Sequence, residues 1–328
     1  HTRSLTVTGV QTCLFRSSGS TMTKVFDQMR KLKGYTDAGS PGRDWNIATG
    51  MVMEGKAAFQ IMGDWAWGAQ RLGLKCKIFI SEFVSESRAE AMRKLDAEVI
   101  RVKGNYDNSL KECIKQSKEN NWEIVQDVSW EGYKEVPKLI MAGYTIMVKE
   151  ILDELKSNSI THVFLQAGVG GMAAAMIAGF AKLSKDIPRF IIVEPENADC
   201  VFQSIKNNEP TSVDIKKETV MGGMSCGDVS SIAWEILKNS SNYCLTIPDE
   251  AISTTVALLA EKRLSNEKII AGECAVPGVI ALIGSFNNKE YLDKLELNEQ
   301  SNVLLFGCEG LTDNAMYQKL LSDGLQKI

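Results

Sequence analysis

Residues 161–172 read Thr-His-Val-Phe-Leu-Gln-Ala-Gly-Val-Gly-Gly-Met, and this stretch decides the fold. An apolar run stops at a cluster of glycines, and the alanine-rich run 173–176 then favours a helix. The order predicts a buried strand, a tight turn and the first turn of a helix. Glycines let the backbone approach a ligand closely, and the N–H groups and dipole at a helix start attract anions. The stretch therefore predicts a site for a phosphorylated cofactor or substrate.

Strand and helix patterns alternate on both sides of this stretch. Strands are expected at 75–81, 97–102, 122–126, 161–166, 189–193, 243–247 and 302–306. Helices are expected at 86–95, 106–120, 135–156, 171–184, 198–206, 277–286 and 314–321, and one more runs from the N-cap Asp249 to Glu261. This alternation indicates parallel βαβ units, and strands that are apolar at every position indicate helices on both faces. The predicted fold class is therefore α/β, a parallel sheet with helices on both faces.

The composition excludes several classes of protein. A chain of 328 residues with a net charge of −4 holds one large or two medium domains and gives no reason to expect nucleic acid as a partner. No apolar run reaches the roughly 18–20 residues that span a bilayer, so no membrane partner is expected. Eight scattered cysteines and only two histidines predict no metal site and favour a cytoplasmic protein. One histidine, His162, falls in a buried strand, which argues against a catalytic triad.

The first 66 residues differ in character from the rest of the chain. Residues 1–18 lack the apolar core of a signal peptide, and part of them resembles translated sequencing-adapter text, so we expect this segment to be disordered and not biological. In residues 19–66 we expect a helix at 21–32, a second helix capped by Asp44, and a strand at 57–62.

Residues 55–66 resemble the periplasmic sugar-binding proteins of ABC transporters. In that family a tryptophan stacks on the sugar ring and a neighbouring acid accepts hydrogen bonds from its hydroxyls, and Asp64 and Trp65 match these positions. The alternative is that Trp65 and Trp67 pack on the next domain, because tryptophan is usually largely buried. The resemblance covers only a small part of that family's length.

Polar or glycine-rich turns follow four of the predicted strands. They are 126–127, 167–171, 194–196 and 307–313. Ligands of open α/β sheets bind beyond the carboxyl ends of the strands, so we expect these four turns to converge at one edge. Their convergence predicts a binding site more strongly than the glycine stretch does alone.

The region from residue 67 to residue 321 resembles the diaminopropionate ammonia-lyases, a family of fold-type-II pyridoxal-phosphate enzymes. The matching stretches are 125–133, 165–172, 192–195, 198–200, 221–227, 234–237, Gly272 and Glu273 with Gly278, and Glu309 and Gly310 with Thr312 and Asp313. The resemblance implies the cofactor pyridoxal 5′-phosphate, a small amino-acid substrate and the α,β-elimination of 2,3-diaminopropionate to pyruvate and ammonia. It also implies a homodimer, since members of the family are usually dimers.

The resemblance assigns a role to single residues as well. The cofactor phosphate is expected to bind the backbone N–H groups of Gly168, Val169, Gly170, Gly171 and Met172. Asp127 matches an aspartate that handles a proton at the substrate Cα or amine, and its alternative role is a structural or helix-capping carboxylate. Cys226 and Cys308 are expected to be small packing residues rather than nucleophiles.

Four further positions complete the expected site. Glu194 and Glu273 are expected to line the pocket. Thr312 is expected near the pyridine ring, where its hydroxyl can meet the ring nitrogen. Asp313 is expected to cap the last helix.

Two elements of the family are missing from the sequence. The family forms a Schiff base with the cofactor through a lysine in a Lys-x-Glu-x-x-x-Arg-x-Gly-x-x-x-x-Lys-like stretch, and it carries a Thr-x-Gly-Asn-His-Gly element further on. Neither occurs here, and the two resemblances meet at residues 64–73. We therefore expect a chimaera whose lyase-like region is incomplete at its N-terminal side and inactive.

Two other functions stay open at this point. A sugar-binding protein of an ABC transporter rests on residues 19–66, against residues 67–321 for the lyase. Another fold-type-II enzyme, such as threonine dehydratase or cysteine synthase, would share the fold. The stretch 126–133 favours the diaminopropionate enzymes over these relatives.

Overall fold

The computed structural model describes residues 57–59, 75–155 and 160–328, and in these residues all strands pair in parallel. They form two sheets of four strands each, in the orders β3-β2-β1-β4 and β7-β6-β5-β8. The smaller sheet consists of β1 (Ala57–Phe59), β2 (Cys76–Ser81), β3 (Ala97–Val102) and β4 (Glu123–Val125). The larger sheet consists of β5 (His162–Gln166), β6 (Arg189–Pro195), β7 (Tyr243–Ile247) and β8 (Val303–Leu305).

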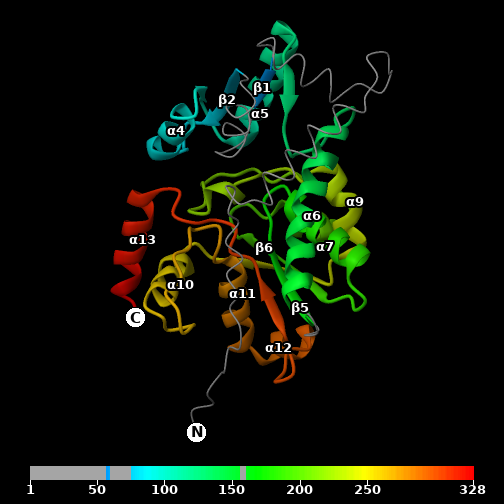
Figure 1. Ribbon diagram of the computed structural model, residues 1–328, viewed down its shortest axis with the longest axis vertical. Helices are drawn as coiled ribbons and strands as arrows, with labels where there is room; N and C mark the ends of the chain where they lie inside the picture. The colour runs from blue at the N-terminus through cyan, green and yellow to red at the C-terminus, as the bar shows by residue number, and fades with distance from the viewer. Residues whose placement is uncertain (1–56, 60–74, 156–159) are drawn as a thin grey trace.

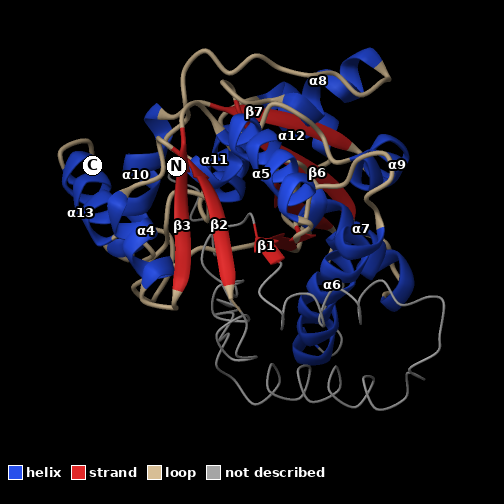
Figure 2. Ribbon diagram, turned by 90° about the horizontal axis from the view of Figure 1, so that it is seen from above, coloured by secondary structure: helices blue, strands red, loops and turns tan. Residues whose placement is uncertain are grey.

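The smaller sheet has one helix on each face (Figure 2). Helix α4 (Glu86–Arg93) buries Ala89 and Met92 against one face, where they meet Ile78 of β2. Helix α5 (Tyr106–Asn120) buries Cys113 against Phe79 on the other face. Because successive side chains of a strand point to opposite faces, Ile78 and Phe79 serve the two helices separately.

The larger sheet lies between two layers of helices (Figure 1). One face carries α6 (Glu135–Leu155), α7 (Gly171–Leu183) and α9 (Ser231–Ser240), and the other carries α10 (Glu250–Ala260), α11 (Pro277–Phe286) and α13 (Asn314–Leu325). Val163 and Leu165 of β5 join the core of the first face, whereas Phe164 between them joins the core of the second. Every position of β5 is therefore buried, which explains why this strand is apolar rather than alternating.

Most of the predicted elements are confirmed. The predicted bounds of β3, α5, β7 and α11 agree with the structure to the residue. The helices α9 and α12 (Lys289–Leu295) were not predicted, and α8 (Cys200–Asn207) begins two residues later than expected. Asp249 stands at the predicted N-cap of α10, but its side chain does not cap the helix. Its carboxylate instead accepts hydrogen bonds from the Thr219 hydroxyl and the Val220 N–H.

Several expectations for the N-terminal part lie outside the described residues. These are the disordered segment 1–18, the helix at 21–32, and the roles of Asp44, Asp64, Trp65 and Trp67. The strand expected at 57–62 is described as β1, which pairs with both β2 and β4. Among the helices that the structure describes, none combines the length and apolar character needed to cross a bilayer.

Candidate active site

The glycine turn (167–171) lies between the end of β5 and the start of α7. Gly170 occupies the N-cap of α7 with a φ of +86°, a left-handed conformation that side chains disfavour. A Cβ atom on Gly170 would also lie 2.8 Å from Cδ1 of Leu237. The first hydrogen bond of the helix runs from the Ala174 N–H to the Gly170 carbonyl, so the N–H groups before it have no partner within the helix. The predicted phosphate cradle is therefore built from backbone.

A second turn closes the other side of the glycine turn. It contains the short helix η1 (Gly222–Met224) and the buried residue Cys226. A Cβ atom on Gly168 would lie 3.1 Å from Sγ of Cys226 and 3.3 Å from the carbonyl oxygen of Gly223. The Val169 N–H donates to the Cys226 thiol, whose pKa burial raises well above its ordinary value. Cys226 is thus a packing residue, as predicted, and a side chain at position 168 would press against it.

Three serines fix the glycine turn to the segment that follows β4. The Ser129 hydroxyl lies 2.7 Å from that of Ser230 and 3.0 Å from that of Ser231, and it accepts from the Ile232 N–H at 2.8 Å. The Ser230 N–H donates to the Val169 carbonyl at 2.9 Å. Hydrogen bonds therefore join Ser129, the start of α9 and the glycine turn into one unit.

Asp127 stands directly beside this unit. Its backbone oxygen lies 3.9 Å from the place that a Cβ on Gly171 would occupy. Its half-buried carboxylate accepts from its own N–H and from that of Val128, and burial raises its pKa from 3.8 to about 6. No described helix begins at Asp127, so the helix-capping alternative is wrong. A carboxyl group whose pKa lies near neutrality is suited to accept and release protons.

The residue before Asp127 holds it in place. The fully buried amide of Gln126 accepts from the Asp127 N–H at 2.8 Å and donates to the Tyr106 hydroxyl at 3.0 Å. The Tyr133 hydroxyl donates to the Ile124 carbonyl at 2.9 Å and accepts from the Gln126 N–H at 2.9 Å. These bonds place an amide and two tyrosines around the end of β4. Of the three residues, Gln126 and Tyr133 lie in the stretch 126–133, whereas Tyr106 lies outside it.

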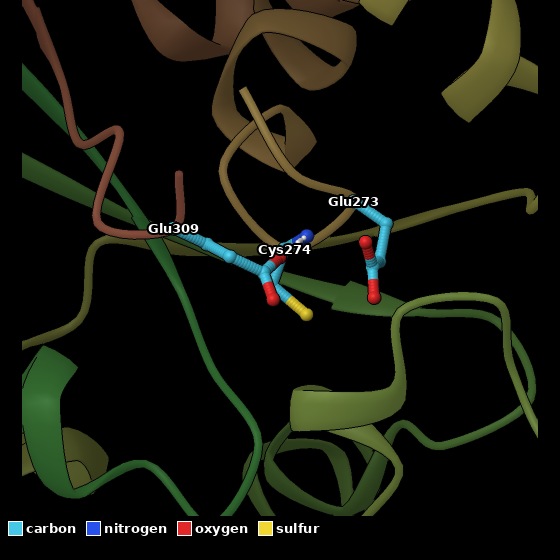
Figure 3. Close-up of side chains that lie close together, drawn as sticks. All are labelled: Glu273, Cys274 and Glu309. Carbon is cyan, nitrogen blue, oxygen red and sulfur yellow. Dashed lines mark hydrogen bonds between the residues drawn. The ribbon is translucent and has the colours of Figure 1, made fainter. Parts of the chain in front are cut away.

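A charged cluster lies at the other end of the site (Figure 3). Glu273 precedes α11, Glu309 follows β8, and both are largely buried. Nη2 of Arg88 on α4 lies 2.5 Å from Oε1 of Glu273 and 2.9 Å from Oε1 of Glu309. Burial and the charge of Glu273 raise the pKa of Glu309. The Cys274 N–H donates to the second oxygen of Glu309 at 2.6 Å, and burial raises the pKa of the Cys274 thiol well above its ordinary value.

Ligand atoms of Glu273, Cys274 and Glu309 lie within 4.8 Å of one another, close enough to share a metal ion. The cation that these carboxylates hold, however, is the guanidinium of Arg88. The arrangement therefore offers a metal no free carboxylate pair. The absence of a metal site stays a prediction.

The remaining predicted residues divide between this cluster and the core. The Thr312 hydroxyl accepts from Arg88 at 3.3 Å, so it belongs to the charged cluster. Asp313 caps α13 by accepting from the Met316 N–H, as predicted. Cys308 is exposed, so the packing role predicted for it is wrong.

Glu194 lies behind the glycine turn rather than in front of it. Its fully buried carboxylate accepts from the Val201 and Phe202 N–H groups at 2.9 Å and 2.6 Å, which satisfies the start of α8. Burial raises its pKa to about 8. The Cys200 thiol contacts both this carboxylate and the Gly168 carbonyl, and so stands between Glu194 and the turn. The structure brings Asp127 and residues 168–172 together, and Glu273 and Thr312 together, while Glu194 supports them from the core.

Arg88 is the functional residue that the sequence did not reveal. Its partners lie 185 and 221 residues away along the chain, so no local spacing connects them. An arginine on an otherwise polar helix is expected to face solvent. The one available signal was Ser85, a residue type that favours N-caps, because it fixes where α4 begins and hence which way Arg88 points.

Comparison with known proteins identifies the class. A family model for pyridoxal-phosphate dependent enzymes matches residues 64–309, so the chain belongs to that family. It is 32% identical over 265 residues to the diaminopropionate ammonia-lyase of Escherichia coli K12, covering 79% of this chain and 67% of that relative. A crystal structure of the Escherichia coli enzyme in complex with an aminoacrylate-PLP azomethine reaction intermediate has a TM-score of 0.74 and 30% identity, covering 82% of this chain and 72% of that one. The predicted fold-type-II fold is confirmed.

Two further similarities bear on the alternatives. A threonine deaminase from Solanum lycopersicum has a TM-score of 0.67 but only 16% identity over 84% of this chain and 71% of that one, which shows the shared fold alone. A probable sugar-binding periplasmic protein of Brucella suis is 58% identical over 48 residues, which cover 15% of this chain and 11% of that protein. This short match agrees with the predicted fusion of two unlike segments. The boundary at residue 66 stays a prediction.

The glycine turn fits the phosphate of pyridoxal 5′-phosphate, the cofactor of this family. The N–H groups at the start of α7 have no partner within the helix, and the left-handed Gly170 sets the turn that precedes them, so the turn offers an anion the donors it needs. The groups that would hold the phosphate are the backbone N–H groups of Gly168, Gly170, Gly171 and Met172, whereas the N–H of Val169, which the sequence also predicted for this role, donates to the Cys226 thiol. When bound, the cofactor withdraws electrons from the substrate Cα and makes its proton acidic.

Proposed function

We propose that the α/β region is an ammonia-lyase that acts on 2,3-diaminopropionate, a small amino acid with two amino groups. The observation that carries the proposal is the position of Asp127, whose backbone carbonyl adjoins the glycine turn at Gly171 and whose carboxyl has a pKa of about 6. The 32% identity to the Escherichia coli lyase supports the choice of substrate. The products are pyruvate and ammonia.

Asp127 has the properties of the proton-transfer group. Above pH 6 its carboxylate is charged and can accept the proton of the substrate Cα, and burial keeps it basic enough to do so. The proton can then leave with the β-amino group as ammonia. The N–H groups of Asp127 and Val128 hold the carboxylate in one orientation while this happens, and Gln126 accepts from the same Asp127 N–H.

We also propose that this chain binds the cofactor without turning over substrate. The family's lysine-bearing stretch does not occur in the sequence, so the covalent link between protein and cofactor has no assigned residue. Titration with pyridoxal 5′-phosphate should show saturable binding that dialysis reverses even after treatment with borohydride. Covalent retention of one cofactor per chain on a lysine would contradict the proposed inactivity.

The substrate class is tested on the same complex. Adding 2,3-diaminopropionate should change the absorbance of the bound cofactor at lower concentration than threonine or serine does. A response to threonine at lower concentration would favour a dehydratase instead.

Two finer properties and one alternative complete the proposal. A homodimer and a cytoplasmic location follow from the family resemblance and the scattered thiols, and light scattering on the purified chain tests the first. The alternative of sugar binding rests on a similarity to 11% of a sugar-binding protein's length. Calorimetric binding of a sugar at micromolar affinity would revive it.

A further inference from the structure

Helix α4 of the smaller sheet reaches across to loops of the larger sheet. The contact consists of polar side chains that converge from three separate parts of the chain. We call this set the α4 latch, and its members are Ser85, Arg88, Glu273, Glu309, Thr312 and Asp313.

Arg88 is the centre of the latch. Its Nη2 atom contacts Glu273 at 2.5 Å, Glu309 at 2.9 Å and the Thr312 hydroxyl at 3.3 Å. Only 12% of the Arg88 side chain is exposed, against 37% for Arg93 on the same helix, which contacts Glu86 and Glu90 in solvent. Buried charge-assisted hydrogen bonds are stronger than exposed ones, so Arg88 differs from Arg93 in what its loss would do.

Ser85 adds a second connection. Its hydroxyl accepts from the Arg88 N–H at 3.3 Å and thereby caps α4. It also hydrogen-bonds the carboxylate of Asp313, which caps α13. The first turns of α4 and α13 are therefore joined through their capping residues.

The latch carries an excess of negative charge. Glu273, Glu309 and Asp313 face one guanidinium, and the Cys274 thiol completes the surroundings of Glu309. Although burial opposes it, the charges of Glu273 and Glu309 raise the pKa of Arg88, so the guanidinium stays charged. Removing it would leave two buried carboxylates facing each other, which would push the loops before α11 and after β8 apart.

Arg88 also touches the wall of the glycine turn. Its Nη1 atom lies 3.5 Å from the place that a Cβ on Gly222 would occupy. The neighbouring Gly223 carbonyl lies 3.3 Å from the corresponding place on Gly168. The turn that contains Gly222 and Gly223 therefore lies between the latch and the glycine turn.

We propose that Arg88 is a positioning residue for the cofactor site. It holds the smaller sheet against the larger one and fixes Glu273 and Thr312, two residues expected to line the pocket. Its effect on cofactor binding rests on the proposed function, whereas its joining of the two sheets does not. Arg88 acts through the loops that it holds and has no proposed part in the reaction itself.

Hydrogen exchange on the full chain without cofactor tests the joining of the sheets. Arg88→Met should raise exchange in residues 307–313 by about 10-fold, within the range over which residues of one network couple. Arg93→Met, the matched control on the same helix, should leave 307–313 unchanged. Arg88→Lys keeps the positive charge but loses the forked guanidinium that bonds both carboxylates, so exchange in residues 307–313 should rise by an intermediate amount. This variant replaces Arg88→Met if Arg88→Met does not fold.

Titration of the same variants with pyridoxal 5′-phosphate tests the effect on the site. The Kd should rise about 10-fold in Arg88→Met, less in Arg88→Lys, and not in Arg93→Met. Equal exchange in the Arg88 and Arg93 variants would overturn the latch. If Arg88→Met opens 307–313 but leaves the Kd unchanged, the latch joins the sheets without positioning the site, and the proposal is wrong. If the unsubstituted chain binds no cofactor, the proposed function fails, and the exchange data still decide the latch.

Discussion

The glycine-turn side and the α4-latch side of the site are built from different parts of the chain. The glycine turn presents backbone N–H groups, and the side chains packed around it are mostly apolar. The latch presents long charged side chains from α4 and from two loops of the larger sheet. The structure of the glycine turn therefore depends on positions that lack a side chain. The structure of the latch depends on the pairing of opposite charges.

This difference predicts how each end responds to substitution. A backbone cradle tolerates no added atom but is insensitive to pH, because its N–H groups do not titrate. A charged cluster tolerates changes in shape but depends on the protonation state of each member. Substitutions on the two sides should thus differ in size and in pH dependence.

The largest effect is expected at Gly170. Gly170→Val places a branched side chain in a left-handed conformation and against Leu237, whose Cδ1 atom is 2.8 Å from the new Cβ. Strain and overpacking together should lower the free energy of unfolding by about 3 kcal/mol, equally at pH 5 and pH 8. Urea denaturation measures this.

Gly143→Ala is the matched control for that experiment. Gly143 lies in α6 with nothing within 4 Å of a new Cβ, and its φ is ordinary. It should gain about 0.5–1 kcal/mol, since alanine loses less backbone entropy in a helix than glycine does. A neutral Gly170→Val would show that the turn is not rigid and that the comparison with the latch fails.

The next effect tests the one charged group on the glycine-turn side. Asp127 has its pKa raised from 3.8 to about 6, so its folded form binds a proton more tightly than its unfolded form. Stability is then full below pH 4, falls as the pH rises to 6, and stays low above that. Asp127→Asn should remove this fall and be more stable than the unsubstituted chain above pH 6 by about 1 kcal/mol, after allowance for partial exposure.

Stability curves of both proteins between pH 4 and pH 8 measure the effect of Asp127→Asn. Asparagine keeps an oxygen that can accept from the Val128 N–H, so loss of that bond does not confuse the result. Coincident curves would show that the carboxylate is adequately solvated and is not the poised base of the proposed reaction.

The sequence predicted the backbone side of the site better than the charged side. Glycines and apolar strands leave a local pattern, because a turn or a buried strand constrains successive residues. The turn at 167–171 and Asp127 were found from such patterns. Arg88 was not, because its partners Glu273 and Glu309 lie on loops of the larger sheet that are distant along the chain.

The partners of Glu194 and Asp249 also could not be predicted from the sequence. Both were assigned from their place at the end of a strand or the start of a helix. In the structure Glu194 serves α8, and the carboxylate of Asp249 serves Thr219 and Val220 rather than α10. A carboxylate takes the nearest unsatisfied donors, and these are known only once the loops are placed.

On the latch side the counterpart of Asp127→Asn is Glu309→Gln. Burial and Glu273 raise the pKa of Glu309 above 4.5, so stability should fall as the pH rises above that value in the unsubstituted chain. Arg88 offsets much of this, and the fall should be below about 1 kcal/mol. Glu309→Gln should flatten the curve while leaving Arg88 paired with Glu273.

The control for Glu309→Gln is Glu290→Gln, whose fully exposed carboxylate pairs with Lys294. That variant should follow the unsubstituted curve closely. If the stability curve of Glu309→Gln also coincided with that of the unsubstituted chain, the Glu309 carboxylate would behave as a solvated group. The contrast between the two sides of the site would then be lost.

The smallest effect is expected in the chemical labelling of the cysteine thiols, which tests both sides of the site without altering the fold. Cys226 beside the glycine turn and Cys274 in the latch both have thiol pKa values raised by burial, whereas Cys308 is exposed. The thiolate is the reactive form, so iodoacetamide at pH 7.5 should label Cys308 first among these three and leave the other two unmodified in the folded chain. Peptide mapping by mass spectrometry identifies the labelled residues, and Cys308→Ala supplies the control.

Labelling of Cys274 in Arg88→Met but not in Arg93→Met would show that the latch alone keeps that thiol covered. Cys226 should stay protected in both variants, because it is covered by packing against Gly168 and not by charge.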